Sequence, residues 1–297
     1  MRRIRIDAGM NRLLEDLLKV MTLERLELDL FRGESRDIGS PQVFGGQVLG
    51  QALVAATATV ENREVHSLHA YFLRRGDFNS PIVYEVDRAW DGKHFATRRV
   101  VAIQHGQQIF NMSASFQMPE TGLDHQFTMP DVPQPEALPD LDQFLATHPN
   151  LPPALLKILE QKRPFEFRPV EPPSLTRAPK APPIKHVWIR AVDTLPDDEA
   201  LHRCLLAYAS DFQLLDTALK PHGLSMMRDK LVIASIDHAM WFHRSLRVDD
   251  WLLYAMDSPS ASGARGFTRG SIFSRDGRLV ASVSQEGLIR VMPQTAP

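Results

Sequence analysis

Three polar side chains in the second half of the chain form a set that could activate a water molecule. They are the carboxylate of Asp211, the hydroxyl of Ser235 and the amide of Gln285. Gln285 alternates with Ala281 and Val283 in a strand-like segment, so it is expected on an inward, apolar face, where a buried amide needs polar partners. Such a trio can bind, orient and partly deprotonate one water without a metal or a covalent intermediate. A thioester is reactive enough for a water activated this weakly.

Each member of the trio also has a plainer interpretation. Asp211 falls within a predicted helix, Asp198–Lys220, and borders its apolar face, where an ordinary helical aspartate would also fit. Ser235 lies in a predicted strand, Leu231–Phe242, and could simply fill space. No Gly-x-Ser-x-Gly elbow occurs in the chain, so a classical serine nucleophile is not expected. Asp237, on the same strand face as Ser235, competes with Asp211 for the role of carboxylate.

Four histidines in predicted strands are further candidates for bases or metal ligands: His66, His69, His238 and His243. Histidines spread in this way are more often structural, and their spacing matches no metal-ligand pattern. Neither a metal nor a cofactor is expected. The single cysteine, Cys204, lies on an apolar helical face and is interpreted as a buried structural thiol.

The elements that must position the trio are present twice in the chain. One frame recurs at an offset of 171 residues: Gly92, Thr97, Arg98 and Gly106, then Gly263, Thr268, Arg269 and Gly277. Upstream, a string around His69 has an echo around His238 at an offset of 169. Two copies are too few for a solenoid, so the pattern predicts a fused pseudo-dimer.

Each copy combines one long buried helix with antiparallel strands. The first helix follows Gly45-Gly46, and its small and apolar residues cover most of its circumference. A shorter amphipathic helix is predicted earlier, over residues 12–32. A sheet curled around a helix is the hot-dog arrangement. The fold class expected is therefore α+β, a double hot dog with two fused units. Pairing their sheets edge to edge into one continuous sheet removes two exposed edges.

The predicted boundaries follow composition. Residues 1–117 form the N-terminal unit and residues 186–297 the C-terminal unit that carries the trio. Residues 118–185 form a connection, since 15 of the 22 prolines fall there and a central strand does not tolerate that density.

Composition excludes several classes of protein. The net charge is −2 and no basic run is present, so no nucleic-acid partner is expected. No apolar run is long enough to span a membrane. The basic start is not followed by the apolar stretch of a signal peptide. With one cysteine, a cytoplasmic location is expected.

Longer strings carry a specific resemblance. In the second half they are Ile233–His243, Trp251–Tyr254, Ser260–Gly266 and Val283–Gly287, and in the first half Val43–Val48, His66–Leu73 and Ala114–Gln117. The chain resembles the type II (TesB-type) acyl-CoA thioesterases from about Leu23 to about Arg290. The resemblance implies a double hot dog that hydrolyses fatty acyl-CoA and assembles as a homodimer or homotetramer.

The resemblance also assigns roles to the trio. In that family an Asp, a Thr or Ser, and a Gln activate the water, and the matching positions here are Asp211, Ser235 and Gln285. Many members have Thr at the Ser235 position. One site per chain is expected, because the first long helix lacks an acidic residue and Gln117 is only a loose counterpart of Gln285.

Substrate contacts are less determined. Backbone N–H groups at Gly45 and Gly46 could face the thioester carbonyl, although close packing of the helix explains these glycines equally well. Several arginines could meet the phosphates of coenzyme A, with Arg265 the favoured one among Arg74, Arg75, Arg98, Arg265 and Arg269. Two other functions stay open: an enoyl-CoA hydratase, and a non-catalytic acyl-CoA-binding protein.

Overall fold

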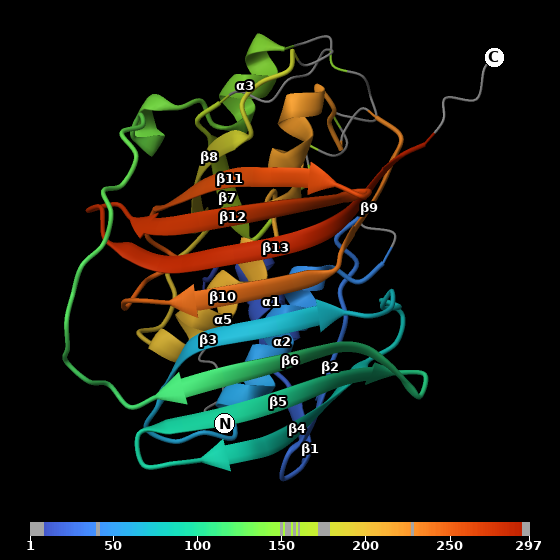
Figure 1. Ribbon diagram of the computed structural model, residues 1–297, viewed down its shortest axis with the longest axis vertical. Coiled ribbons are helices and arrows are strands. Elements are labelled where there is room, and N and C mark those ends of the chain that lie inside the picture. Colours follow the sequence, from blue (N-terminus) through green and yellow to red (C-terminus); the bar gives the residue numbers. More distant parts are fainter. Residues whose placement is uncertain are drawn as a thin grey trace.

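A computed structural model describes residues 9–292, apart from 40–41, 149–150, 152–155, 157–158, 160, 172–178 and 227–228. In this part of the chain one antiparallel sheet of 13 strands curves around two central helices (Figure 1). The sheet runs in the order β1-β2-β4-β5-β6-β3-β10-β13-β12-β11-β8-β7, and β9 also pairs with β13. The predicted double hot-dog fold is confirmed.

The first half of the sheet wraps the helix α2 (Gly45–Thr57), whose residues from Gly46 to Ala56 are all buried. The elements around it are α1 (Arg12–Met21), β1 (Glu24–Glu27), β2 (Leu30–Gly33), β3 (Glu64–Phe72), β4 (Ile82–Asp91), β5 (Phe95–Gln104) and β6 (Gln107–Gln117).

The second half wraps the helix α5 (Glu199–Ser210), which is buried from Leu201 onward. Its strands are β8 (Ile184–Ala191), β9 (Leu231–Ser235), β10 (Asp237–Phe242), β11 (Leu252–Ser262), β12 (Arg265–Ser274) and β13 (Leu279–Val291). The 3₁₀ helix η2 (Leu215–His222) follows α5. The proline-rich stretch contributes the 3₁₀ helix η1 (Pro135–Ala137), α3 (Leu141–Thr147) and the edge strand β7 (Phe165–Pro169), which pairs with β8.

The two halves meet along β3 and β10, which pair antiparallel with Ala239 opposite His69. The pairing makes one sheet from two and lays α2 beside α5 (Figure 1). The helices approach closely because glycine faces the neighbouring backbone. A Cβ on Gly46 would lie 2.3 Å from the carbonyl oxygen of Tyr208. Cys204 in this seam is buried, as predicted, and burial raises the pKa of its thiol to about 12.

Two predicted helices are shorter than the apolar periodicity indicated. The segment 12–32 is helical only to Met21, and the rest forms the β1–β2 hairpin, which extends the sheet beside β4. The segment 198–220 stops being α-helical at Ser210, and Gln213 turns the chain with a φ of 65° before η2 begins. The apolar pattern continues because η2 also packs its leucines against the sheet. The apolar periodicity therefore indicated which residues are buried on both sides of the turn, and it did not indicate one continuous helix.

The repeat is real at the level of elements, but the predicted frame is wrong for Arg98 and Arg269. Asp87 pairs with Arg99 in the first hairpin, and Asp257 pairs with Arg269 in the second, each 170 positions later. The predicted match of Arg98 with Arg269 is therefore one residue out of register. A slip of one residue moves a side chain to the other face of a strand. Accordingly, Arg98 is buried and Arg269 is exposed.

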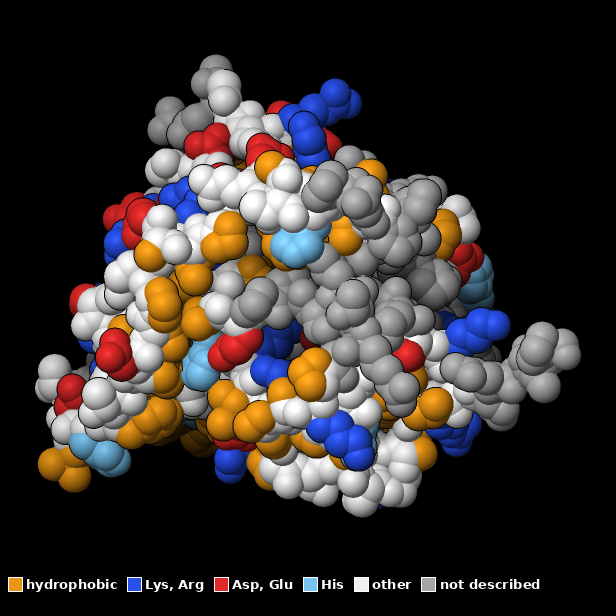
Figure 2. Space-filling view, turned by 90° about the horizontal axis from the view of Figure 1, so that it is seen from above, with side chains coloured by type: hydrophobic (Ala, Val, Ile, Leu, Met, Phe, Trp, Pro, Cys, Tyr) orange, Lys and Arg blue, Asp and Glu red, His pale blue; other side chains and the backbone are white. Residues whose placement is uncertain are grey.

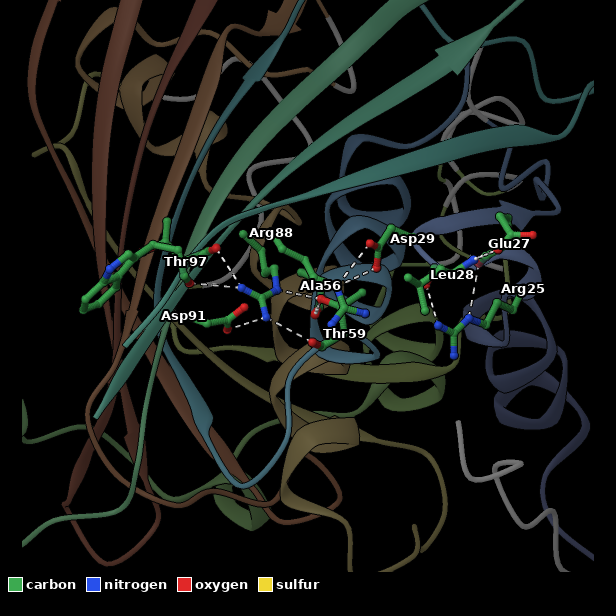
Figure 3. Close-up of polar contacts among 11 residues, drawn as sticks. Arg25, Glu27, Leu28, Asp29, Ala56, Thr59, Arg88, Asp91 and Thr97 are labelled. Carbon is green, nitrogen blue, oxygen red and sulfur yellow. Dashed lines mark hydrogen bonds and ion pairs between the residues drawn. The ribbon is translucent and has the colours of Figure 1, made fainter. Parts of the chain in front are cut away.

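Arg98 fastens the C-terminal end of α2 to the sheet. Its guanidinium, 1% exposed, donates to Thr59 Oγ1 at 2.8 Å and to the Thr59 carbonyl at 3.1 Å. The same group donates to Asp91 Oδ1 at 2.7 Å and to the Thr97 carbonyl at 3.0 Å. Thr59, Asp91 and Thr97 converge on this point from the helix end and the two strands (Figure 3). A buried cation is tolerated there because its donors are satisfied.

The surface of the molecule carries charges of both signs. Acidic and basic side chains are interspersed over the face that Figure 2 shows, in keeping with a net charge of −2. Among the described residues, no helix has the length and apolar character needed to cross a bilayer.

Substituting Arg98 and Arg269 one at a time tests whether they lie on opposite strand faces, as the structure shows, or at equivalent positions, as the sequence predicted. Arg98→Met should lower the free energy of unfolding by about 2–4 kcal/mol, because several buried acceptors lose their donor. Arg269→Met should change it by less than about 1 kcal/mol, because its ion pair with Asp257 is exposed. Urea denaturation of both variants measures this difference. Equal losses would contradict the assignment of the two arginines to opposite faces.

Candidate active site

The structure brings the three predicted residues together. The sequence predicted that Asp211 lies within the helix, but in the structure it is the C-cap of α5. Ser235 ends β9, and Gln285 lies in β13 on the inward face, 1% exposed. The Gln285 amide nitrogen donates to Asp211 Oδ1 at 2.9 Å and to Ser235 Oγ at 2.7 Å. Ser235 Oγ lies 3.4 Å from Asp211 Oδ1.

The first unit supplies the wall opposite Asp211. The N-terminus of α2 points at the carboxylate, and the Gly46 backbone N–H hydrogen-bonds it. Gly45 has no room for a side chain, since a Cβ there would lie 2.7 Å from Asp211 Oδ2. These contacts support the close-packing interpretation of Gly45 and Gly46. The Gly46 N–H hydrogen-bonds the Asp211 carboxylate, and a contact of these N–H groups with a thioester carbonyl stays a prediction.

Burial sets the protonation of the carboxylate. It raises the pKa of Asp211 to about 6, although hydrogen bonds from Gln285, Gly46 and Ser235 act in the opposite direction. The surrounding protein removes water that would otherwise solvate the charge. Asp211 is thus poised to exchange a proton near neutral pH, as a general base must.

His238, one of the four histidines that the sequence offered as candidate bases and that we interpreted as structural, adjoins the trio; the sequence did not predict its contact with Gln285. Its side chain is 0% exposed, and Nδ1 lies 3.2 Å from Gln285 Oε1. Its Nε2 lies 2.9 Å from Ser210 Oγ. The alternation of His238 with Met240 and Phe242 was the available signal, because it puts the imidazole on the inward strand face.

A pocket of about 180 Å³ opens beside the trio, between the start of α2 and strands β3 and β6. Ser235 and Gly45 belong to its lining. Phe72, Phe110 and Val48 give it apolar walls, and the segment Leu73–Gly76 contributes two arginines to its lining. The pocket could hold an extended, partly apolar ligand next to the trio.

Other predicted candidates lie elsewhere. Arg265 is exposed on the outer face of β12 and pairs with Glu286 at 2.9 Å, so the structure does not bring it to the trio. Asp237 accepts the Glu286 backbone N–H at 2.7 Å and belongs to the opposite strand face from His238. In the described part of the chain, no group of three or more His, Cys, Asp and Glu side chains is placed to hold a metal ion.

The first unit has apolar residues where the second has the polar ones. By the strand registers, Ser235, His238 and Gln285 correspond to Val65, Leu68 and Ala114. These three are buried. Gln117, which the sequence suggested as the counterpart of Gln285, is therefore not equivalent to it. The registers support one site per chain.

Together these features define a class: a double hot-dog protein with a carboxylate, a hydroxyl and an amide converging at the seam between its halves. The family described as "Acyl-CoA thioesterase" matches residues 158–288, and the "Acyl-CoA thioesterase N-terminal domain" matches residues 32–117.

Individual relatives extend the match over almost the whole chain. Human acyl-coenzyme A thioesterase 8 is 44% identical, covering 93% of this chain and 89% of its own. Acyl-CoA thioesterase 2 of Haemophilus influenzae is 42% identical, covering 95% and 99%. The crystal structure of the acyl-CoA thioesterase II TesB2 from Mycobacterium marinum is 43% identical, covers 93% and 98%, and superposes with a TM-score of 0.76. The chain belongs to the type II acyl-CoA thioesterase family, whose members hydrolyse the thioester of acyl-CoA, and the predicted resemblance is confirmed.

The raised pKa of Asp211 predicts how stability depends on pH. Its folded pKa of about 6 lies above the unfolded value of 3.8, so folding favours the protonated form. The contribution of the protonated Asp211 carboxyl group to the free energy of unfolding is fully present below about pH 4. It is lost as the pH rises through about 6. The ionised carboxylate then costs at most about 3 kcal/mol, less where water reaches it.

Asp211→Asn removes this titration. The free energy of unfolding of the variant relative to wild type should therefore rise between pH 4 and pH 8, by up to about 3 kcal/mol. Chemical denaturation at several pH values measures it. A difference that is constant with pH would show that the carboxylate is not desolvated.

Proposed function

We propose that the protein hydrolyses fatty acyl-CoA to a free fatty acid and coenzyme A, using a water activated by Asp211, Ser235 and Gln285. One observation carries the proposal: the buried Gln285 amide donates to both Asp211 and Ser235. Burying an amide costs free energy unless its donors and its acceptor find partners. By donating to both groups, the Gln285 amide holds the carboxylate and the hydroxyl next to each other, with their remaining lone pairs free for a water.

Each residue then has a defined task. Asp211 accepts a hydrogen bond from the water and takes its proton as the oxygen attacks the thioester carbon. Ser235 holds the water in line for the attack, and Gln285 fixes Ser235 and Asp211 relative to each other by donating to both. The positive end of α2 stabilises the charge that develops on the carbonyl oxygen. When the carbon–sulfur bond breaks, Asp211 returns the proton to the departing thiolate. No cofactor is required.

The substrate path follows from the pocket. Its apolar walls at Phe72 and Phe110 suit the chain next to the thioester, and Ser235 also lines it. Arg74 and Arg75 also line the pocket, and both are exposed, but Arg74 Nη1 donates to the Gln108 carbonyl at 2.6 Å. We place the phosphates of coenzyme A at Arg75 rather than at Arg265.

Two other functions are less well supported. An enoyl-CoA hydratase would need Asp211 and a histidine facing the substrate, but His238 is 0% exposed and lies behind Gln285. A non-catalytic acyl-CoA-binding protein would not need an aspartate with a pKa near 6 beside a hydroxyl and an amide. Assembly into a homodimer or homotetramer, and a cytoplasmic location, belong to the same proposal; they rest on the family and on the single cysteine.

Removing the Asp211 carboxylate or the Gln285 amide should stop turnover without unfolding the protein. Asp211→Asn and Gln285→Ala should each lower kcat by about 10³-fold, while circular dichroism stays like that of wild type. In wild type, kcat/KM should rise with pH with an apparent pKa near 6. Release of free thiol from acyl-CoAs of increasing chain length measures both the rates of the variants and the pH profile of wild type.

Wild-type rates in the two variants would refute the mechanism. Binding without turnover by wild type at every chain length would favour the non-catalytic protein.

Two arginine variants test the substrate path. Arg75→Glu should raise KM for acyl-CoA by about tenfold, because it sets a negative charge against the phosphates, and added salt should reduce the effect. KM for the matching acyl-pantetheine, which lacks the nucleotide, should not change. Arg265→Glu is the control on the outer face and should behave as wild type. The reverse pattern would move the phosphate site to Arg265.

A further inference from the structure

His238 is a buried titratable group that the proposed mechanism does not use. It lies in β10 with no exposed surface, and both of its ring nitrogens have partners. Nδ1 faces the Gln285 carbonyl oxygen, Oε1, at 3.2 Å, and Nε2 faces Ser210 Oγ at 2.9 Å. Ser210 immediately precedes Asp211. The imidazole therefore links the end of α5 to the catalytic amide.

The mechanism depends on which way the Gln285 amide points. A primary amide can be turned by 180° with little change of shape, exchanging two donors for an acceptor. The nitrogen must face Asp211, because an ionised carboxylate only accepts hydrogen bonds. In the opposite orientation Oε1 would face the carboxylate, and the donors to Asp211 and Ser235 would be lost.

The histidine has the chemistry to select one orientation. Burial lowers its pKa to about 4, so the ring is neutral near pH 7 and carries a single proton. Because Gln285 Oε1 can only accept, that proton must be on Nδ1. The bare Nε2 then accepts from the Ser210 hydroxyl. Ser210 Oγ also lies 2.9 Å from the Ala207 carbonyl, but its one proton goes to the ring in this tautomer.

We propose that His238 is a positioning residue whose Nδ1–H holds the Gln285 carbonyl and thereby keeps the amide nitrogen directed at Asp211 and Ser235. This inference rests on the proposed function, because it assigns His238 to the same water-activating trio. The hydrogen bonds then run in one direction, from Ser210 through His238 and Gln285 to the carboxylate. A chain polarised in this way is stronger than its separate links.

Two substitutions separate a positioning role from simple core packing. His238→Leu fills much of the same space but removes the donor, so Gln285 is free to turn. His238→Asn places an amide nitrogen at the position of Nδ1 and can still donate to Oε1. His238→Leu should lower kcat by about 10- to 100-fold with little change in KM. His238→Asn should recover kcat to within about threefold of wild type.

A matched control removes another buried histidine. His202 is 1% exposed on α5, about two and a half turns of helix before Asp211. Its Nδ1 accepts from the Val248 backbone N–H. His202→Leu should lower the melting temperature and leave kcat unchanged. The comparison separates loss of stability from loss of positioning.

A measurement on the wild-type protein tests the same point without relying on turnover. Nitrogen-15 NMR of labelled histidine distinguishes the two neutral tautomers, and His238 should carry its proton on Nδ1. The test therefore stands even where His238→Leu fails to fold.

The outcomes separate this inference from the proposed function. An Nε2–H tautomer, wild-type kcat in His238→Leu, or equal losses in the Leu and Asn variants would each overturn the positioning role. If Asp211→Asn is inactive in the same assay, the proposed function survives that result. If Asp211→Asn is fully active, the proposed function itself fails.

Discussion

The backbone hydrogen bonds between β3 and β10 are the interaction on which the rest of the molecule depends. They convert two sheets with open edges into one and bring α2 and α5 together inside it. The helices can approach only because Gly46 faces the Tyr208 carbonyl without a side chain. The start of one helix then meets the end of the other, and the Asp211 carboxylate lies at that meeting point.

The same close packing gives the carboxylate its chemistry. Removing water from Asp211 raises its pKa to about 6 and costs stability at neutral pH. The Gly46 N–H and the Gln285 amide offset part of that cost without solvating the group as water would. Packing and hydrogen bonding thus give an aspartate a carboxyl group that titrates near neutral pH. Active sites commonly exchange stability for reactivity in this way.

Duplication explains both the frame of the site and its asymmetry. The two units repeat strand for strand at an offset near 170, and even their β-bulges recur. Polar residues appear only at the second set of positions, while Val65, Leu68 and Ala114 occupy the first. The first unit keeps an apolar interior there and supplies the α2 N-terminus instead. Its contribution to the site is a backbone terminus and a pocket wall.

The sequence by itself determined the family, the double hot-dog architecture and the inward position of Gln285. Each follows from local strings, the internal repeat or strand alternation, which need no knowledge of distant contacts. Only the tertiary structure decided where α5 ends, that Arg98 and Arg269 lie on opposite faces, and that His238 adjoins Gln285. These depend on register and on packing between segments far apart in the chain, and a slip of one residue reverses the face. Asp211 and Gln285 are 74 residues apart, and the packing of the end of α5 against β13 brings them within hydrogen-bond distance.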